Sequence, residues 1–247
     1  MATVGFLPEV DDQQVMVGVL GGFQVIWAAR TIGLPKVSQR LLALLALRGR
    51  MMKRAAVAGV LWPDSLEGHA QCNLRSALSR LQGAARRAVT MTRMELGLAE
   101  GVAVDIRHAQ ALAQRLLDPS VTLGCAEMGA SAMATLSTEL LPDWYDDWVL
   151  AEAEDWRQLR LHALEALTRR LTADGRLGEA AGAARAAVRA EPLRESSHAA
   201  LIQVHLAEGN QSEAVREFTH YRALLRAELG LEPTQRLYQL IDGLRSL

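Results

Sequence analysis

The sequence predicts a mainly α-helical protein with a small β-containing region near its N-terminus. Half of its 247 residues are hydrophobic, only 4% are aromatic, and Ala and Leu, which favour helices, make up most of the apolar half. Short β-rich runs fall within the first hundred residues, whereas the pattern is helical throughout from Val104 onward. We therefore expect a flexible tail over residues 1–14, a first domain over 15–104 and a helical second domain over 105–247.

The first domain is expected to open with short strands. The runs MVGVLG (16–21) and FQVIWA (23–28) are separated at Gly21-Gly22, and RTIGLP (30–35) is a candidate third strand. The segment SQRLLALLALR (38–48) has the spacing of a helix, with Ser38 as its expected N-cap and Gly49 at its end. A second, shorter helix is predicted over residues 53–62, where Pro63 stops it.

A third helix and a hairpin complete the first domain. Residues 64–67 read Asp-Ser-Leu-Glu and resemble a capping box, which would open a helix that runs to about Leu81 and ends near Gly83. Residues 88–99 are predicted to form a β-hairpin, with Arg93 and Met94 close to its tip. A small sheet, three helices and a hairpin, in this order, are the parts of a winged helix-turn-helix, whose third helix reads a DNA groove.

The second domain is predicted to consist of helices throughout. Two Ala/Leu-rich helices are expected around a break at Pro119, and five more follow an aromatic and acidic segment; the ranges are 105–118, 125–139, 148–173, 176–190, 194–208, 211–228 and 233–246. Gly175 and Gly209 are 34 positions apart, as are Glu179 and Glu213. This interval is the length of a tetratricopeptide (TPR) helix pair, so we expect TPR-like pairs from residue 148 onward.

The outer face of the predicted third helix, within QCNLRSALSRLQ (71–82), is unusual. Its apolar residues form one stripe centred on Leu74, and small side chains lie almost opposite. A solvated helix surface would explain this face taken alone, but small side chains also let a helix approach base edges, while arginines reach phosphates or guanine. The residues predicted to contact bases are Asn73, Arg75, Ser76, Ser79 and Arg80, and those predicted to contact phosphates are Lys53, Arg54 and Arg93.

Charge is distributed unevenly along the chain. Residues 1–104 hold 12 Lys+Arg against 7 Asp+Glu, whereas residues 105–247 hold 15 against 21. A basic first half suggests a polyanion, here double-stranded DNA, as partner. Cys72 and Cys125 lie far apart without metal-ligand spacing, and no apolar run reaches the length of a membrane span, so a reduced, cytoplasmic protein is expected.

Residue types able to support catalysis do not form a recognisable site in the sequence. The six histidines are scattered, and His198 and His205 lie on one helix face without a third metal ligand. The acidic run over residues 143–154 is interpreted as a solvated turn ahead of a helix, and its aromatic residues as packing residues: Trp144, Tyr145 and Trp148. No nucleophile is placed beside a base, so we expect no enzymatic activity, no cofactor and no bound metal.

Segments across residues 16–245 are similar to one family of bacterial proteins. In the first half these are VGVLGGFQV, QRLLALLALRG, VLWPD and NLRSALSRL, and in the second half LLPDWYDDWVLAE, ADGRLGEA, AVRAEPLRESSHAALI and YRALLRAELGLEPT. The first set resembles the OmpR-type winged-helix domain of SARP-type transcriptional regulators, from its opening strands to its recognition helix. The second set resembles the bacterial transcriptional activator domain (BTAD) of the same proteins.

The resemblance implies an activator that binds direct repeats beside a promoter, head to tail as a possible homodimer, and contacts RNA polymerase. The segment QGAARRAV departs from the longer basic turn that relatives often have, so Arg86 and Arg87 could replace some phosphate contacts. No P-loop motif occurs, and the chain length predicts a short, stand-alone member. The alternatives are a TPR-like interaction adaptor whose winged-helix domain no longer binds DNA, and a regulator that senses a small ligand in its helical groove.

Overall fold

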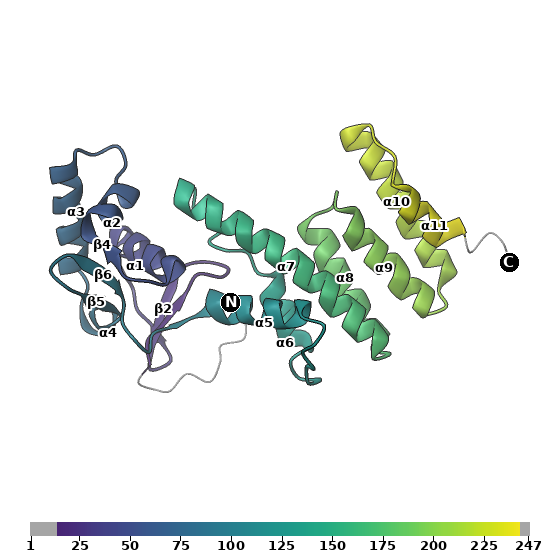
Figure 1. Cartoon of the computed structure of the whole chain (residues 1–247), viewed down its shortest axis with the longest axis horizontal. Coiled ribbons are helices and arrows are strands. Elements are labelled where there is room, and N and C mark those ends of the chain that lie inside the picture. Colours follow the sequence, from purple (N-terminus) through teal and green to yellow (C-terminus); the bar gives the residue numbers. More distant parts are fainter. Residues whose placement is uncertain (1–13, 243–247) are drawn as a thin grey trace. The chain divides into compact units, whose positions relative to one another are not determined.

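The computed structural model describes residues 14–242, and residues 1–13 of the predicted tail lie outside this range. The chain forms two compact units. The first comprises residues 14–109 together with 138–156, and the second comprises residues 110–137 together with 157–242 (Figure 1). The segment 138–156, which precedes and begins a long helix, therefore belongs to the same unit as the predicted winged helix-turn-helix.

Two small sheets frame the first unit. The four-stranded sheet has the order β3-β2-β1-β7, in which β1 pairs antiparallel with β2 and parallel with β7; its strands are β1 Met16–Gly18, β2 Gln24–Trp27, β3 Arg30–Thr31 and β7 Ala103–Val104. The three-stranded sheet has the order β4-β6-β5, with β4 Met52–Lys53, β5 Val89–Met91 and β6 Glu95–Leu98. The three opening strands and the hairpin are confirmed, whereas β4 and β7 were not predicted.

The helices of this unit follow the predicted order. They are α1 Lys36–Arg48, α2 Arg54–Leu61, α3 Glu67–Ser79 and the short α4 Gly83–Arg87, which was not predicted. Both predicted N-terminal caps are wrong. The cap position of α1 is Pro35, so Ser38 lies inside the helix, and that of α3 is Leu66, without a side-chain cap bond, so Asp64 precedes the helix and forms no capping box.

A half-buried carboxylate fixes the end of β1 to the start of the next helix, α5 (Asp105–Leu117). The carboxylate oxygens of Asp105 accept hydrogen bonds from the backbone N–H groups of Val19, Leu20 and Ile106, at 2.7 to 3.0 Å. Burial raises the pKa of the Asp105 carboxyl, and the three backbone donors oppose this rise. A Cβ atom at Gly18 would lie 3.2 Å from the Asp105 carboxylate and 2.6 Å from Gln24, so this strand end requires glycine.

The remaining helices largely match their predicted ranges. They are α6 Ala130–Ser137, α7 Asp147–Ala173, α8 Leu177–Ala190, α9 Glu195–Ala207, α10 Gln211–Leu229 and α11 Gln235–Asp242. The expected helix over 125–139 is shorter, and the end of the one expected over 233–246 lies outside the described residues. None of the helices within residues 14–242 combines the length and apolar character that a membrane span requires.

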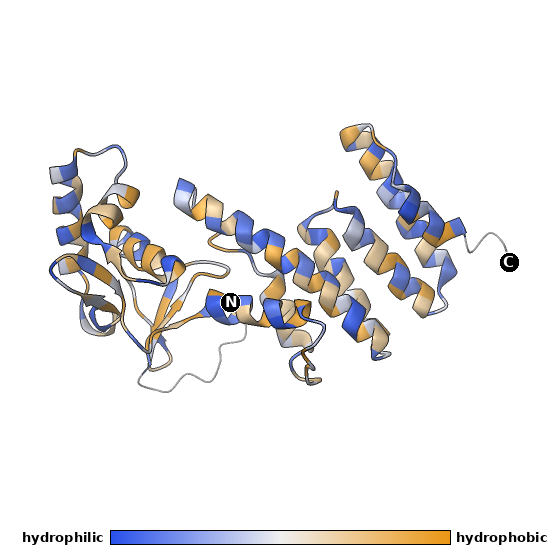
Figure 2. Cartoon of the chain, in the orientation of Figure 1, coloured by the Kyte–Doolittle hydropathy of each residue, from blue (hydrophilic) through white to orange (hydrophobic). Residues whose placement is uncertain are grey.

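The repeat predicted in the second half has a structural basis. Gly175 and Gly209 each follow a helix with φ of +74° and +73°, a conformation that favours glycine. Ala180 and Ala214, one turn into the helices that follow, are both fully buried. After each glycine, the N–H of Arg176 or Asn210 donates to the backbone oxygen of Leu171 or His205, so the turns α7–α8 and α9–α10 repeat one form. Helix α9 packs against both α8 and α10, and these helices carry both apolar and hydrophilic positions (Figure 2). The predicted fold class, mainly α with a winged helix-turn-helix and TPR-like helices, is confirmed.

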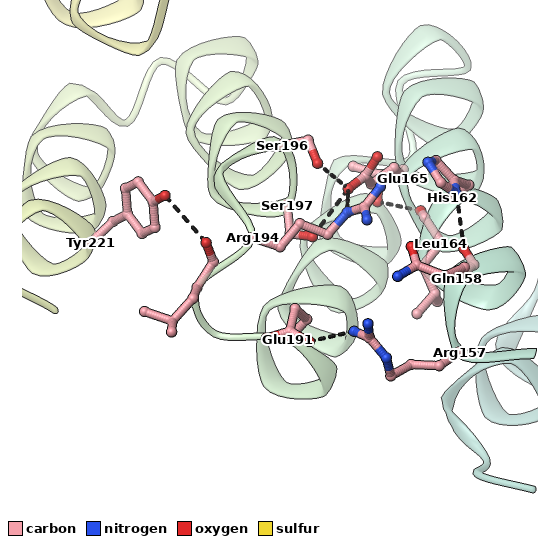
Figure 3. Close-up of polar contacts among 12 residues, drawn as sticks. Arg157, Gln158, His162, Leu164, Glu165, Glu191, Arg194, Ser196, Ser197 and Tyr221 are labelled. Atoms are coloured by element: carbon pink, nitrogen blue, oxygen red, sulfur yellow. Dashed lines mark hydrogen bonds and ion pairs between the residues drawn. The ribbon is translucent and has the colours of Figure 1, made fainter. Parts of the chain in front are cut away.

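Ionic contacts fix the connection between α8 and α9 (Figure 3). Oε1 of Glu165, on α7, accepts hydrogen bonds from Arg194 at 2.8 Å, Ser196 at 2.6 Å and Ser197 at 3.1 Å. Burial alone would raise the pKa of Glu165, but these donors outweigh it and hold the pKa below its usual range. Arg157 also binds Glu191, so two residues of α7 anchor the same connection.

The turn between β2 and β3 is strained. Ala28 and Ala29 have φ of +48° and +56°, in the left-handed region that disfavours side chains with a Cβ. We expect Ala29→Gly to raise the free energy of unfolding by roughly 0.5–1 kcal/mol. Glycine relieves the strain of the folded turn, and the greater conformational entropy that it gives the unfolded chain offsets part of this gain. Urea unfolding monitored by circular dichroism measures this change. The same substitution at exposed Ala56 in α2 should lower the free energy of unfolding, and equal effects at both positions would contradict the argument.

The Glu165 contacts predict a pH dependence of stability. Because the pKa of Glu165 is lower in the folded chain than the ordinary glutamate value of 4.5, its contribution is present above pH 4.5 and is lost as pH falls through the folded pKa. In Glu165→Gln the free energy of unfolding should therefore be lower at neutral pH and decline less below 4.5. Unfolding curves across this range, with exposed Glu228→Gln as control, measure the difference; parallel profiles for Glu165→Gln and the wild type would refute it.

Candidate nucleic-acid interface

Helix α3 buries one stripe and exposes the opposite face. Its buried residues are Ala70, Leu74, Ala77 and Leu78, as the helical spacing predicted. All five residues predicted to contact bases are exposed: Asn73, Arg75, Ser76, Ser79 and Arg80. The same packing that holds the helix in the core therefore presents these five side chains to solvent on one element.

Contacts within this face orient part of it. The Ser79 hydroxyl donates to the backbone oxygen of Ser76 at 3.0 Å, and Nη2 of Arg75 lies 2.9 Å from Sγ of Cys72. Arg80 is the C-cap residue, because α3 ends at Ser79 rather than near Leu81 as predicted. The centre of the face thus consists of short side chains, and a flexible arginine leaves from the end of the helix.

A buried hydroxyl supports the last turn of α3. The Ser38 Oγ atom, fully buried within α1, donates to the backbone oxygen of Ala77 at 3.1 Å. In a continuing helix this oxygen would accept from Leu81, but the N–H of Leu81 bonds to Leu78 instead. Helix ends leave such carbonyls unpaired unless a side chain or water binds them. Ser38, predicted as the N-cap of its own helix, instead caps the C-terminus of α3.

The three residues predicted to contact phosphates lie beside the hairpin. Lys53 in β4 is opposite Glu95 in β6, and the N–H of Arg54 donates to the backbone oxygen of Met94 at 2.9 Å. Lys53 and Arg93 are exposed, whereas Arg54 is half-buried. The extra strand β4, missed in the sequence because it is only two residues long, is what brings α2 to the hairpin.

The hairpin tip is held by a threonine. The Thr92 hydroxyl accepts hydrogen bonds from the N–H groups of Met94 at 3.3 Å and Glu95 at 3.0 Å, and the Thr92 N–H donates to the backbone oxygen of Glu95 at 2.8 Å. This closed turn projects Arg93 and Met94, of which Met94 is 70% exposed. The sequence placed these two residues at the tip correctly.

The arginines that follow α3 make contacts within the unit. Arg86 donates to the backbone oxygen of Val89 at 3.1 Å, and the guanidinium carbon of Arg87 lies 4.6 Å from the centre of the Trp27 ring. Both residues belong to α4, which carries the chain from α3 to the hairpin. Arg87 therefore links α4 to the opening sheet through a cation–π contact.

Other residues considered for metal or ligand binding are described next by their contacts and exposure. His198 is fully buried, with Nδ1 2.6 Å from Glu217 and Nε2 2.8 Å from the backbone oxygen of Pro192. Trp144 and Trp148 are buried as predicted, but Tyr145 is 80% exposed, so its interpretation as a packing residue is wrong. Within the described residues, no group of His, Cys, Asp or Glu is arranged to hold a metal ion.

These features define a protein with a winged helix-turn-helix followed by TPR-like helices. Residues 104–245, more than half of the chain, match the bacterial transcriptional activator domain family. The chain therefore belongs to this family, which places it among transcriptional regulators and not in an enzyme family. The resemblance to SARP-type regulators seen in the sequence motifs is confirmed.

Two curated relatives share the name Regulatory protein AfsR. The protein of Streptomyces coelicolor is 28% identical over 252 residues, covering 96% of this chain and 25% of its own length. That of Streptomyces griseus is 26% identical over 228 residues, covering 84% of this chain and 22% of its own length. The chain thus spans about a quarter of the length of these relatives.

A solved structure shares the fold across nearly the whole chain. Mycobacterium tuberculosis EmbR, in complex with a low-affinity phosphopeptide, superposes with a TM-score of 0.67 over 95% of this chain and 66% of that chain. The sequence identity is 19%, so this likeness supports the fold alone.

The Ser38 contact generates a prediction about stability. Ser38→Ala would leave the buried Ala77 oxygen without its side-chain donor, so the free energy of unfolding should fall by about 1–3 kcal/mol. Thermal unfolding measures the change. Ser79→Ala, which removes an exposed hydroxyl from the same helix end, should change stability by less than about 0.5 kcal/mol. Similar losses in both variants would show that Ser38 does not support α3.

Proposed function

We propose that the chain is a sequence-specific DNA-binding regulator that inserts α3 into a major groove. Residues 15–104 act as the OmpR-type DNA-binding domain and residues 105–247 as the activator domain. The observation that carries the proposal is the exposed face of α3, where small residues stand between two arginines and the cations of the hairpin lie on the same unit. A major groove admits one helix, and the helix backbone can approach the base edges closely only when the side chains that face the bases are short.

Each predicted residue has a distinct role in this proposal. Arg75 and Arg80 supply donors for guanine edges or phosphates, and Asn73 can pair with adenine. The Ser79 hydroxyl already donates its proton to Ser76, so towards DNA it offers lone pairs, which suit the amino groups of adenine or cytosine. Lys53, Arg54 and Arg93 bind phosphates and set the position of α3 without specifying sequence.

The proposed regulatory output is activation. Binding to direct repeats beside a promoter would place the activator domain next to RNA polymerase in the cytoplasm, as the resemblance to SARP-type regulators implies. In vitro transcription from a promoter fragment with purified polymerase tests this step. Unchanged transcript levels despite bound protein would reject activation while leaving DNA binding intact.

Substitutions on α3 and at the hairpin should affect DNA binding differently. With a duplex selected from genomic fragments, Arg75→Ala/Arg80→Ala should weaken specific binding by roughly 1–3 kcal/mol for each lost base contact. Lys53→Ala should weaken binding to all sequences and reduce the slope of log affinity against log salt by about one. Fluorescence anisotropy measures both effects. Arg185→Ala/Arg189→Ala, exposed on α8, is the matched control, and an unchanged affinity for the α3 variant would reject the interface.

The two cysteines provide a second test within one molecule. Both are exposed, but only Cys72 lies on the proposed DNA-facing surface. Bound duplex should slow alkylation of Cys72 by N-ethylmaleimide at least tenfold while Cys125 reacts at its free rate, because close approach of bases excludes the reagent. Mass spectrometry of the two peptides measures the rates. Equal rates with and without DNA would favour the alternative, an interaction adaptor that no longer binds DNA.

A further inference from the structure

Helix α10, near the yellow end of the chain in Figure 1, packs against α9 and α11. Phe218, Tyr221 and Leu225 are among its buried residues, and they form one cluster with residues of these two helices. The opposite side of α10 carries five exposed side chains, which we call the outer stripe: Val215, Thr219, Arg222, Arg226 and Leu229. In the part of the chain that the structure describes, this side of the helix is therefore open to a partner.

The outer stripe runs along the axis of the helix. Its members follow one another at alternating intervals of four and three residues, so they fall within a sector about 80° wide on the helical wheel. From Val215 to Leu229 the stripe extends over about 21 Å. Such alternation is the spacing of a coiled-coil seam, along which a second helix lies. An extended peptide would need the open edge of a sheet instead, so the stripe has the geometry for a partner helix.

Apolar side chains occupy the two ends of the outer stripe. Val215 is 41% exposed and Leu229 is 55% exposed, and Leu231, just after the helix, is 56% exposed. Among the described residues of this unit, the other large hydrophobic side chain that is exposed is Leu117. The Thr219 hydroxyl donates to the backbone oxygen of Val215 at 2.8 Å, so a partner can cover it without leaving a donor unpaired. Exposed apolar surface thus gathers at α10, as it does where proteins bind one another.

The charges of α10 are divided between its two sides. The helix holds three arginines and three glutamates, but none of the glutamates belongs to the outer stripe. Glu213 pairs with Arg216, and Glu217 pairs with the buried His198. Glu228 lies roughly 140° around the helix from the centre of the stripe. The outer stripe is therefore positive although the helix as a whole is neutral.

The two arginines of the outer stripe can bind carboxylates of a partner. Arg222 forms no ion pair within residues 14–242, and its guanidinium carbon lies 6.0 Å from the centre of the Phe218 ring. Arg226 lies 3.6 Å from Glu232, but the two side chains are 76% and 50% exposed, so water and salt weaken this pair. An apolar surface placed over a guanidinium would remove its water without replacing it, which disfavours a purely apolar partner. Carboxylates opposite both arginines supply charge-assisted hydrogen bonds instead.

We infer that the outer stripe of α10 is the docking site for an acidic amphipathic helix of another protein. Apolar side chains of the partner cover Val215 and Leu229, and its Asp or Glu side chains bind Arg222 and Arg226. The contact is selective because each covered arginine requires a carboxylate opposite it. The inference goes beyond the proposed DNA contact and does not rest on it, since α10 belongs to a different unit from α3 and the hairpin.

Two designed peptides test the inference with the whole chain. Both are helices of about three heptads with leucines at the two ends of one face. Between the leucines the acidic peptide carries glutamates, and the basic peptide carries lysines at the same positions. In fluorescence anisotropy with labelled peptides, the wild type should bind the acidic peptide at least about tenfold more tightly than the basic one.

Charge reversal on the stripe should reverse this preference. Arg222→Glu/Arg226→Glu should bind the basic peptide more tightly than the acidic one, because lysines then lie opposite carboxylates. Arg222→Gln/Arg226→Gln, which removes the charges without adding new ones, should bind both peptides equally. A wild type that binds neither peptide or shows no preference, or a reversed variant that keeps the wild-type preference, would overturn the inference.

Control variants separate the stripe from general charge and from folding. Arg185→Glu/Arg189→Glu, exposed on α8, carries the same change of charge and should keep the wild-type preference. Val215→Ala/Leu229→Ala should weaken binding of the acidic peptide at least about threefold while the preference for it remains. Thermal unfolding must show that each variant is folded. Loss of the preference in the α8 variant would also contradict the inference.

Two other occupants of the stripe would give different results. If the stripe bound the phosphates of a nucleic acid, Arg222→Gln/Arg226→Gln would lower the affinity for a random duplex. If it bound a second copy of this chain, the same variant would abolish association of the wild type in sedimentation velocity. We expect the variant to match the wild type in both measurements, and either difference would overturn the docking of an acidic helix.

Discussion

The burial of the apolar stripe of α3 is the constraint on which the candidate site depends. Leu74 and Ala77 are almost fully buried, so the rotation of the helix about its axis has one solution and its outer face is fixed. The Ser38 hydroxyl adds a polar contact at the last turn, where backbone oxygens have no N–H partner within the helix. The exposed residues of α3 are therefore positioned by the core rather than by one another.

Other polar contacts also pair a side chain with backbone groups that have no partner in a helix or strand. Asp105 receives three N–H groups where β1 ends, and Arg170 donates to the backbone oxygens of Leu116, Asp118 and Val121 where α5 ends. Both act where regular hydrogen bonding stops. Where such backbone groups are shielded from water, removing the side chain leaves them unpaired, which costs more than the hydrogen bond itself stabilises.

Much of the fold could be predicted from the sequence because its signals are local. Helical periodicity and the 34-residue repeat identified the helix pairs, and Gly175 and Gly209 marked their ends. Ser38 was misassigned as a cap of its own helix because a residue type favoured at helix ends can also serve another element, and only tertiary packing distinguishes the two cases. Asp64 was misassigned because the cap position of α3 lies two residues later, at Leu66. Strand β4 and helix α4 were missed because segments of two and five residues carry no periodicity. On α3 the predicted face is the exposed face, whereas the exposure of Tyr145 required knowing what packs beside Trp144.

The positive charge of the first half of the chain is offset in the folded unit by an acidic segment from the second half. Along the sequence, a basic segment of about a hundred residues suggested attraction to a polyanion. In the folded unit, the acidic segment 138–156 joins that segment, and Arg40 and Arg48 are neutralised by Asp146 and Glu152. Long-range attraction is then small, because the net charge of the unit is close to zero and salt screens exposed charges beyond a Debye length of about 8–10 Å. In the proposed DNA contact, affinity therefore arises locally, at α3 and the hairpin, where short-range contacts can also distinguish one sequence from another.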